Sequence, residues 1–140
     1  MGRASDSKRQ VDLLVIDDQS VMRALIRDFL QTNMPDLAIA EAPDGNRGMR
    51  LVAERDPRVV LMDVNLPDAN GIELTARIRE LRPRTQVIMV SNLGGSAYVE
   101  RAHIAGAFGY VHKDKIYTDL LPFLTRALGA NPPHENGGAQ

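Results

Sequence analysis

Five short apolar runs, each followed by a longer stretch with helical periodicity, are the feature that most limits how this chain can fold. The runs lie at residues 11–17, 37–42, 58–63, 85–91 and 108–113. The first, third and fourth runs are almost continuously apolar, which is typical of parallel strands that are buried on both faces. We therefore expect these three strands in the centre of a sheet.

The stretches between the runs predict helices. After Ser20, apolar residues recur at one-turn spacing over residues 21–30, and Ser20 is placed to act as the N-cap of this helix. Weaker patterns predict helices at about residues 44–55, 71–82, 96–106 and 117–128. This alternation predicts an α/β fold of (βα)5 order, in which a five-stranded parallel sheet is doubly wound, with right-handed crossovers and helices on both faces.

The size and composition of the chain fit one domain. It has 140 residues, of which 44% are hydrophobic and 25% are charged, as in an ordinary globular domain. The segment at residues 1–10 is polar, and the only apolar side chains at residues 130–140 are alanines. We therefore expect the domain to span residues 11–129, between a flexible N-terminal segment and a flexible C-terminal tail.

Composition also excludes several classes of protein. No apolar run approaches the ~20 residues that a membrane span needs, and the polar N-terminus lacks the apolar core of a secretory signal, so we expect a cytoplasmic protein without membrane contact. The chain has no cysteine, which excludes disulfides and thiolate metal sites. Its formal net charge of −1 gives no electrostatic reason to bind nucleic acid, so we expect no direct DNA binding.

Polar side chains stand where the predicted strands end, and ligands of parallel sheets bind beyond the carboxyl ends of the strands. The residues at these ends are Asp17 and Asp18 on the first strand, Asp63 on the third, Ser91 on the fourth and Lys113 on the fifth. Three carboxylates at one edge repel one another unless a cation lies among them. Hard oxygen ligands without a neighbouring His or Cys favour Mg²⁺, or Mn²⁺ in its place.

A lysine and a hydroxyl at the same edge suit a phosphoryl group. Lys113 would supply a positive charge and Ser91 a hydrogen-bond donor. Asp63 follows four apolar residues and directly precedes a segment with Pro67 and Gly71, so its carboxylate would be held at a strand end beside the metal. These features together predict that Asp63 is a nucleophile.

Four segments of the sequence together resemble the receiver domain of bacterial response regulators. They read VIDDQSVMR, LMDVNLPDANGIEL, MVSN and AGAFGYVHKD, and their order and spacing are similar to the family across nearly all of residues 11–129. The resemblance implies the flavodoxin-like receiver fold. Asp114 stands where many receivers carry proline, an ending similar to the branch whose members often bear a C-terminal helix-turn-helix. We expect a stand-alone receiver or an excised one.

The resemblance also implies which residues accept the phosphoryl group and hold the metal. Asp63 would be the phosphoacceptor and a metal ligand, and Asp18 a direct Mg²⁺ ligand. Asp17 would act on the metal indirectly, as a more distant partner. Asn65 would bind the metal through its backbone carbonyl.

Three further residues would bind the phosphoryl group or respond to it. By the resemblance, Lys113 is the phosphate-binding lysine, Ser91 the switch hydroxyl and Tyr110 an aromatic switch on the fifth strand. Their movement would reshape the face made by the fourth helix, fifth strand and fifth helix, roughly residues 96–128. A downstream protein or a second copy of the chain would bind this face.

The implied function is two-component signalling by a phosphoacceptor, which assists its own phosphorylation and dephosphorylation but is not an enzyme. A sensor histidine kinase or a phosphotransfer protein would supply phosphohistidine, and Asp63 would attack it in a Mg²⁺-dependent reaction. The proposed partners are thus the phosphodonor protein and the output partner.

Each of these residues alone also has a structural explanation. Asp63 could form a turn, Lys113 could be solvated at a strand end, and Ser91 could make a local backbone bond. Only their combination favours a site. A flavodoxin-like binder of small phosphorylated molecules is disfavoured, because Asp17 and Asp18 would present negative charge to the anion. A phosphorylation-independent interaction module of receiver fold is the remaining alternative.

Overall fold

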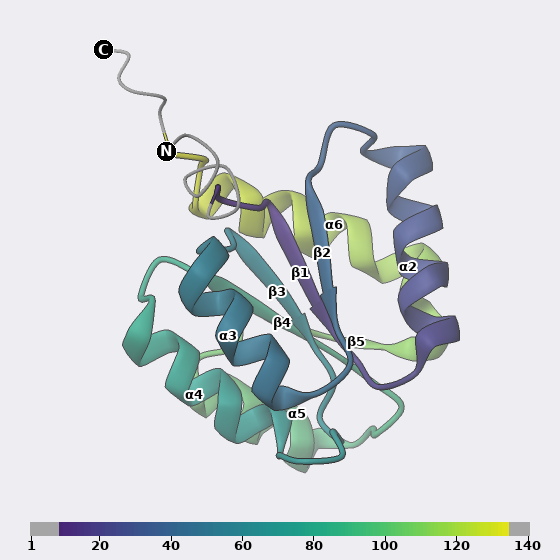
Figure 1. Cartoon of the computed structure of the whole chain (residues 1–140). Coiled ribbons are helices and arrows are strands. Elements are labelled where there is room, and N and C mark those ends of the chain that lie inside the picture. Colours follow the sequence, from purple (N-terminus) through teal and green to yellow (C-terminus); the bar gives the residue numbers. More distant parts are fainter. Residues whose placement is uncertain (1–8, 135–140) are drawn as a thin grey trace.

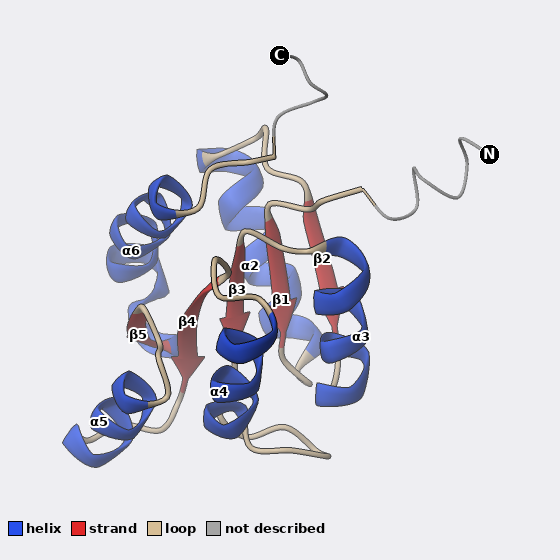
Figure 2. Ribbon diagram, turned by 90° about the vertical axis from the view of Figure 1, so that its left-hand side faces the viewer, coloured by secondary structure: helices blue, strands red, loops and turns tan. Residues whose placement is uncertain are grey.

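A computed structural model of the chain describes residues 9–134, so most of the ends that we expected to be flexible lie outside the described residues. The strands, all parallel, are β1 (Leu13–Ile16), β2 (Ile39–Ala42), β3 (Val59–Met62), β4 (Gln86–Ser91) and β5 (Gly109–His112). Their order in the sheet is β2-β1-β3-β4-β5, and Figure 2 shows them side by side. The expected central strands are confirmed, because β1, β3 and β4 occupy the middle positions.

Helices connect the strands and cover both faces of the sheet. They are α2 (Ser20–Asn33), α3 (Gly45–Arg55), α4 (Gly71–Leu81), α5 (Ser96–Ile104) and α6 (Ile116–Ala130), with a 3₁₀ turn, η1 (Lys113–Lys115), before the last. Figure 1 shows α2 and α6 against one face and α3, α4 and α5 against the other. The predicted doubly wound α/β fold is thus confirmed. No helix within residues 9–134 is long and apolar enough to cross a membrane.

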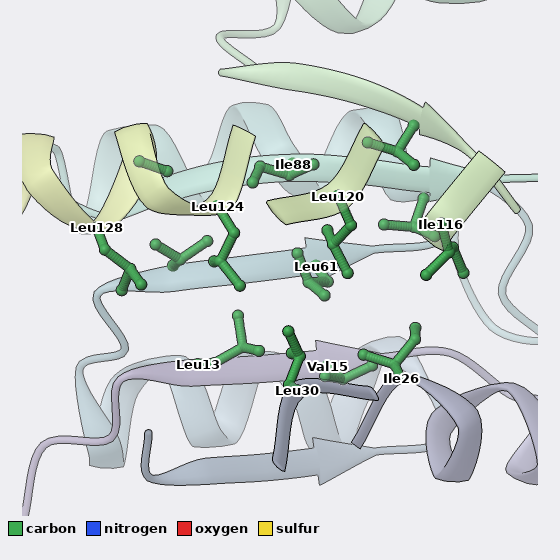
Figure 3. Close-up of a cluster of buried hydrophobic side chains, with 14 residues drawn as sticks. Leu13, Val15, Ile26, Leu30, Leu61, Ile88, Ile116, Leu120, Leu124 and Leu128 are labelled. Carbon is green, nitrogen blue, oxygen red and sulfur yellow. The ribbon is translucent and has the colours of Figure 1, made fainter. Parts of the chain in front are cut away.

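Alternate side chains of each strand point into two separate cores. Leu13, Val15 and Leu61 face α2 and α6, whereas their neighbours in the strands face α3, α4 and α5. Figure 3 shows the first core, in which Leu124 of α6 approaches the sheet beside Leu61. Burial of both strand faces explains why the central strands need almost unbroken apolar sequence.

The first helix begins one residue earlier than predicted. Gln19 is the N-cap residue of α2, and Ser20 is already helical, so the prediction of Ser20 as N-cap is wrong. The reason lies in the turn after β1, where the Asp17 carboxylate accepts a hydrogen bond of 2.8 Å from the Gln19 backbone N–H. This bond fixes the chain at Gln19 and lets the helix start at Ser20.

Ordered contacts continue past residue 129, where we expected the domain to end. The side chain of Asn131 is buried and donates to the backbone carbonyl of Arg58 at 3.2 Å. In return, the Arg58 guanidinium donates to the backbone carbonyls of Asn131 and Leu128 at 2.8 and 2.9 Å. The end of α6 is therefore capped by the residue that directly precedes β3, a contact that apolar periodicity does not reveal.

Candidate functional site

The strand order brings three carboxylates together at the carboxyl edge of the sheet. The chain passes from β1 outward to β2 and then to β3 on the other side of β1, so the order of strands reverses between β1 and β3. Asp17 and Asp18 follow β1, and Asp63 follows β3. One carboxylate oxygen from each lies within 4.8 Å of the other two. Asp17 and Asp63 are buried, and Asp18 is exposed.

Lys113 reaches this cluster from the start of η1, directly after β5. Its side chain is only 4% exposed, and its Nζ lies 2.8 Å from Oδ2 of Asp17 and 3.0 Å from Oδ2 of Asp63. The lysine thus bridges the carboxylates of two different strands. The structure places it where the sequence predicted, with its ammonium directly against the candidate nucleophile.

Burial and the contact between Asp63 and Lys113 act in opposite directions on the pKa values of these two groups. Burial raises the pKa of Asp63, and the Asp17 charge raises it further, although the hydrogen bond from Lys113 partly opposes this rise. Burial alone would lower the pKa of Lys113, but its hydrogen bonds to Asp17 and Asp63 outweigh burial and raise that pKa. Lys113 therefore stays charged, whereas ionisation of Asp63 is less favourable in this site than it is in water.

The donors of this site fit a divalent magnesium ion. Three carboxylates set against one ammonium leave a formal charge of −2, which one divalent cation would balance. All the donors are hard oxygens, the ligand type that Mg²⁺ prefers. Burial is the main cause of the raised pKa of Asp63, and the nearby Asp17 charge adds to it, so a cation bound beside these carboxylates would favour the ionised form of Asp63.

The loop after Asp63 is fixed by several hydrogen bonds. Asn65 pairs with Asn70 in an isolated antiparallel bridge, and the Gly71 N–H donates to the carbonyl of Val64 at 2.7 Å. Asp68 ties the loop to α3, because its carboxylate accepts the backbone N–H groups of residues 45 and 46 at 2.8 and 2.9 Å. These bonds keep Asn65 next to the candidate nucleophile.

Ser91 and Tyr110 both contact the loop after β4. Ser91 is buried, and its Oγ accepts a hydrogen bond of 3.2 Å from the backbone N–H of Leu93. The Tyr110 hydroxyl donates to the carbonyl of the same Leu93 at 2.7 Å. Burial raises the pKa of the Tyr110 hydroxyl, so it stays a protonated donor. One residue of the loop therefore connects the two side chains that the sequence suggested as switches.

Two side chains at this edge were missed by the sequence analysis. Gln19 accepts a hydrogen bond from Lys113, and Arg23 donates to the backbone carbonyl of Asp17 at 2.5 Å. Arg23 also pairs with Glu41 of β2 at 3.1 Å. Polar residues in the first turns of a helix are common, so their sequence positions carried no signal of these contacts.

The chain matches the family described as the response regulator receiver domain over residues 13–122. It is 35% identical over 102 residues to the chemotaxis protein CheY of Halobacterium salinarum, covering 72% of this chain and 82% of that protein. It is 29% identical to the transcriptional regulatory protein DegU of Brevibacillus brevis, covering 77% of this chain and 46% of the relative. The chain spans about half the length of several of the curated relatives that it matches.

The fold agrees with solved structures of the same class. The BeF3-activated DrrB receiver domain superposes with a TM-score of 0.76 at 29% identity, covering 86% of this chain and 98% of that one. The family match covers most of the chain, and its end at residue 122 lies within the last helix of the domain. The chain therefore belongs to the response regulator receiver domain family.

Proposed function

We propose that this chain accepts a phosphoryl group on Asp63 from a histidine kinase or a phosphotransfer protein in a Mg²⁺-dependent reaction. Receiver domains are signalling modules that take phosphoryl groups from histidine kinases and bind Mg²⁺ at an acidic site. The observation that carries the proposal is the pairing of a buried aspartate, Asp63, with the Lys113 ammonium 3.0 Å away, at an edge that also gathers Asp17 and Asp18.

The chemistry assigned to the chain's own residues is nucleophilic displacement. A carboxylate oxygen of Asp63 attacks the phosphorus of phosphohistidine, the P–N bond breaks, and its electron pair leaves with the imidazole nitrogen, which takes up a proton. The Lys113 ammonium donates to the phosphoryl oxygens, on which charge develops. When bound, Mg²⁺ would neutralise further charge on the same oxygens.

The metal would be held from two strands and one loop. Asp18 and Asp63 would bind it directly, the backbone carbonyl of Asn65 would complete the protein ligands, and Asp17 would act indirectly. The difference in exposure supports this division, because the exposed Asp18 lies on the solvent side of the site, from which the metal and the phosphodonor would enter. The buried Asp17 already accepts from Lys113 and from the Gln19 backbone.

Phosphorylation of the purified chain tests this function. After incubation with Mg²⁺ and acetyl phosphate or phosphoramidate, we expect intact-mass spectrometry to show the addition of one phosphoryl group. With EDTA in place of Mg²⁺, we expect no addition, because the uncompensated carboxylates repel the anionic donor. A chain that stays unmodified with Mg²⁺ would instead favour the phosphorylation-independent interaction module.

The proposed response to phosphorylation starts at Ser91. A phosphoryl group on Asp63 attracts the Ser91 hydroxyl, which would give up the Leu93 N–H and draw the loop after β4 inward. The Tyr110 hydroxyl donates a hydrogen bond to the carbonyl of Leu93, so the Tyr110 ring would move with the loop. Tyr110 also lines a cavity of about 310 Å³ between α5, β5 and α6, and its movement would reshape residues 96–128, where a downstream protein or a second copy would bind.

Ser91→Ala separates phosphorylation from this response. We expect Asp63 of the variant still to accept a phosphoryl group, because Ser91 is not the nucleophile. Backbone amide shifts beyond residue 96 on addition of beryllofluoride, measured by NMR, should fall to less than about half of the wild-type values. The variant lacks the hydroxyl that would transmit the coupling between Asp63 and residues 96–128, and this coupling amounts to only a few kcal/mol. Shifts as large as those of the wild type would exclude this route.

A further inference from the structure

Lys113 has a third partner that neither the phosphoryl transfer nor the metal uses. Its Nζ donates to Oε1 of Gln19 at 3.0 Å, in addition to its contacts with Asp17 and Asp63. An ammonium has three N–H donors and no acceptor, so these three oxygens satisfy it completely. Two of them belong to charged carboxylates, and the third belongs to a neutral side-chain amide.

We propose that Gln19 is a positioning residue that holds the Lys113 ammonium against the phosphoacceptor while the metal and the phosphoryl group occupy the carboxylates. This inference rests on the function proposed for Asp63. It assigns to Gln19 a part in the reaction through Lys113, without contact between Gln19 and the reacting phosphorus.

Lys113 and a bound metal ion would compete for the same carboxylate oxygens. A divalent cation held in the acidic cluster would withdraw electron density from the carboxylate of Asp63 directly and from that of Asp17 indirectly. A carboxylate oxygen affected in this way is a weaker acceptor for Lys113. Once Asp63 carries a phosphoryl group, one lysine donor turns to its oxygens. The Gln19 amide oxygen is the partner of Lys113 that keeps its full acceptor strength through these steps.

The positions of the two side chains suit this part. Lys113 is almost fully buried, whereas Gln19 is exposed, so the amide lies on the solvent side of the ammonium. A lysine has a long, flexible stem, and its ammonium is strongly hydrated. An acceptor on the solvent side replaces the water that would otherwise draw the ammonium away from Asp63.

The side chain of Gln19 can be replaced without loss of the backbone contacts around it. Its backbone N–H, not its side chain, holds Asp17, and its side chain makes no capping bond to α2. Gln19→Ala therefore removes the contact to Lys113 while it keeps the turn and the start of the helix. Gln19→Glu restores an acceptor, and Gln31→Ala, an exposed position of the same helix, is the matched control.

The first measurement needs no phosphoryl group. Hydrogen exchange of the Lys113 ammonium is followed by ¹⁵N NMR in the unphosphorylated protein with Mg²⁺. We expect exchange to be about tenfold faster in Gln19→Ala, since the ammonium loses one of its three hydrogen bonds. Exchange should be slow in Gln19→Glu and Gln31→Ala, and thermal unfolding midpoints should agree among all four proteins. Exchange in Gln19→Ala as slow as in the wild type overturns the proposal.

The second measurement connects the contact to the reaction. We expect the rate constant of phosphorylation by acetyl phosphate to fall about three- to tenfold in Gln19→Ala and to recover in Gln19→Glu. Faster ammonium exchange with an unchanged rate constant would overturn the positioning role. A wild type that takes up no phosphoryl group overturns the function proposed for Asp63 instead, and the exchange rates alone then decide whether Gln19 holds Lys113.

Discussion

Asp63→Asn will reduce uptake of a phosphoryl group from acetyl phosphate by about a thousandfold or more. An amide has neither the nucleophilic oxygen nor the charge that the reaction requires, and it is a poor replacement for a carboxylate ligand of Mg²⁺. The measurement is intact-mass spectrometry over time, with peptide mapping of the wild type to locate the modified residue. Asp36→Asn, an exposed aspartate between α2 and β2, is the control and should react like the wild type.

The thermal stability of Asp63→Asn shows whether the variant has lost only its nucleophile or has also lost its folded structure. Because burial raises the pKa of Asp63, its ionisation costs folding free energy in the metal-free protein. This cost is absent at pH values below the pKa of the unfolded aspartate and is complete above the raised pKa of the folded one. In EDTA, Asp63→Asn should therefore unfold at the same temperature as the wild type or higher at neutral pH, and the difference should vanish in acid. Phosphorylation of a well-folded Asp63→Asn protein at another residue would contradict the assignment.

Gly71→Ala will have the largest effect on stability. A Cβ atom at this position would lie 1.9 Å from the backbone carbonyl oxygen of Asp63 and 3.0 Å from Cγ of Met62. The first contact is with backbone, which cannot rotate away, so the start of α4 and the end of β3 must separate. We expect a loss of about 3 kcal/mol or more in the free energy of unfolding, measured with urea, and weaker stabilisation by Mg²⁺ as Asp63 is displaced.

Gly129→Ala provides the matched control for this substitution. Gly129 also lies in a helix, and a Cβ atom there would meet nothing within 4 Å. Because alanine favours helices more than glycine does, we expect this variant to be as stable as the wild type or more stable, by up to about 1 kcal/mol. A loss in Gly71→Ala no larger than the change in Gly129→Ala would show that the loop after β3 yields easily and does not hold Asp63 in place.

The sequence by itself determined the fold and which charged residues lie together at the carboxyl edge of the sheet. Apolar periodicity reports which residues are buried, and nearly unbroken apolar runs identified β1, β3 and β4 as the central strands. In a parallel sheet, all strands end at the same edge, so the residues that follow them meet whatever the details of packing. For this reason the convergence of Asp17, Asp63 and Lys113 was predictable without coordinates.

Only the tertiary structure decided which side chains hold these groups in place. Gln19 meets Lys113 across 94 positions of sequence, and Arg58 meets Asn131 across 73. Gly71 is required because the Asp63 carbonyl approaches it closely, and the Asp68 carboxylate binds the backbone at the N-terminus of α3. These contacts depend on the rotamers of polar side chains and on the distance between neighbouring elements. Apolar periodicity carries no information about rotamers or about these distances, because it reports only the spacing of the positions that face the core.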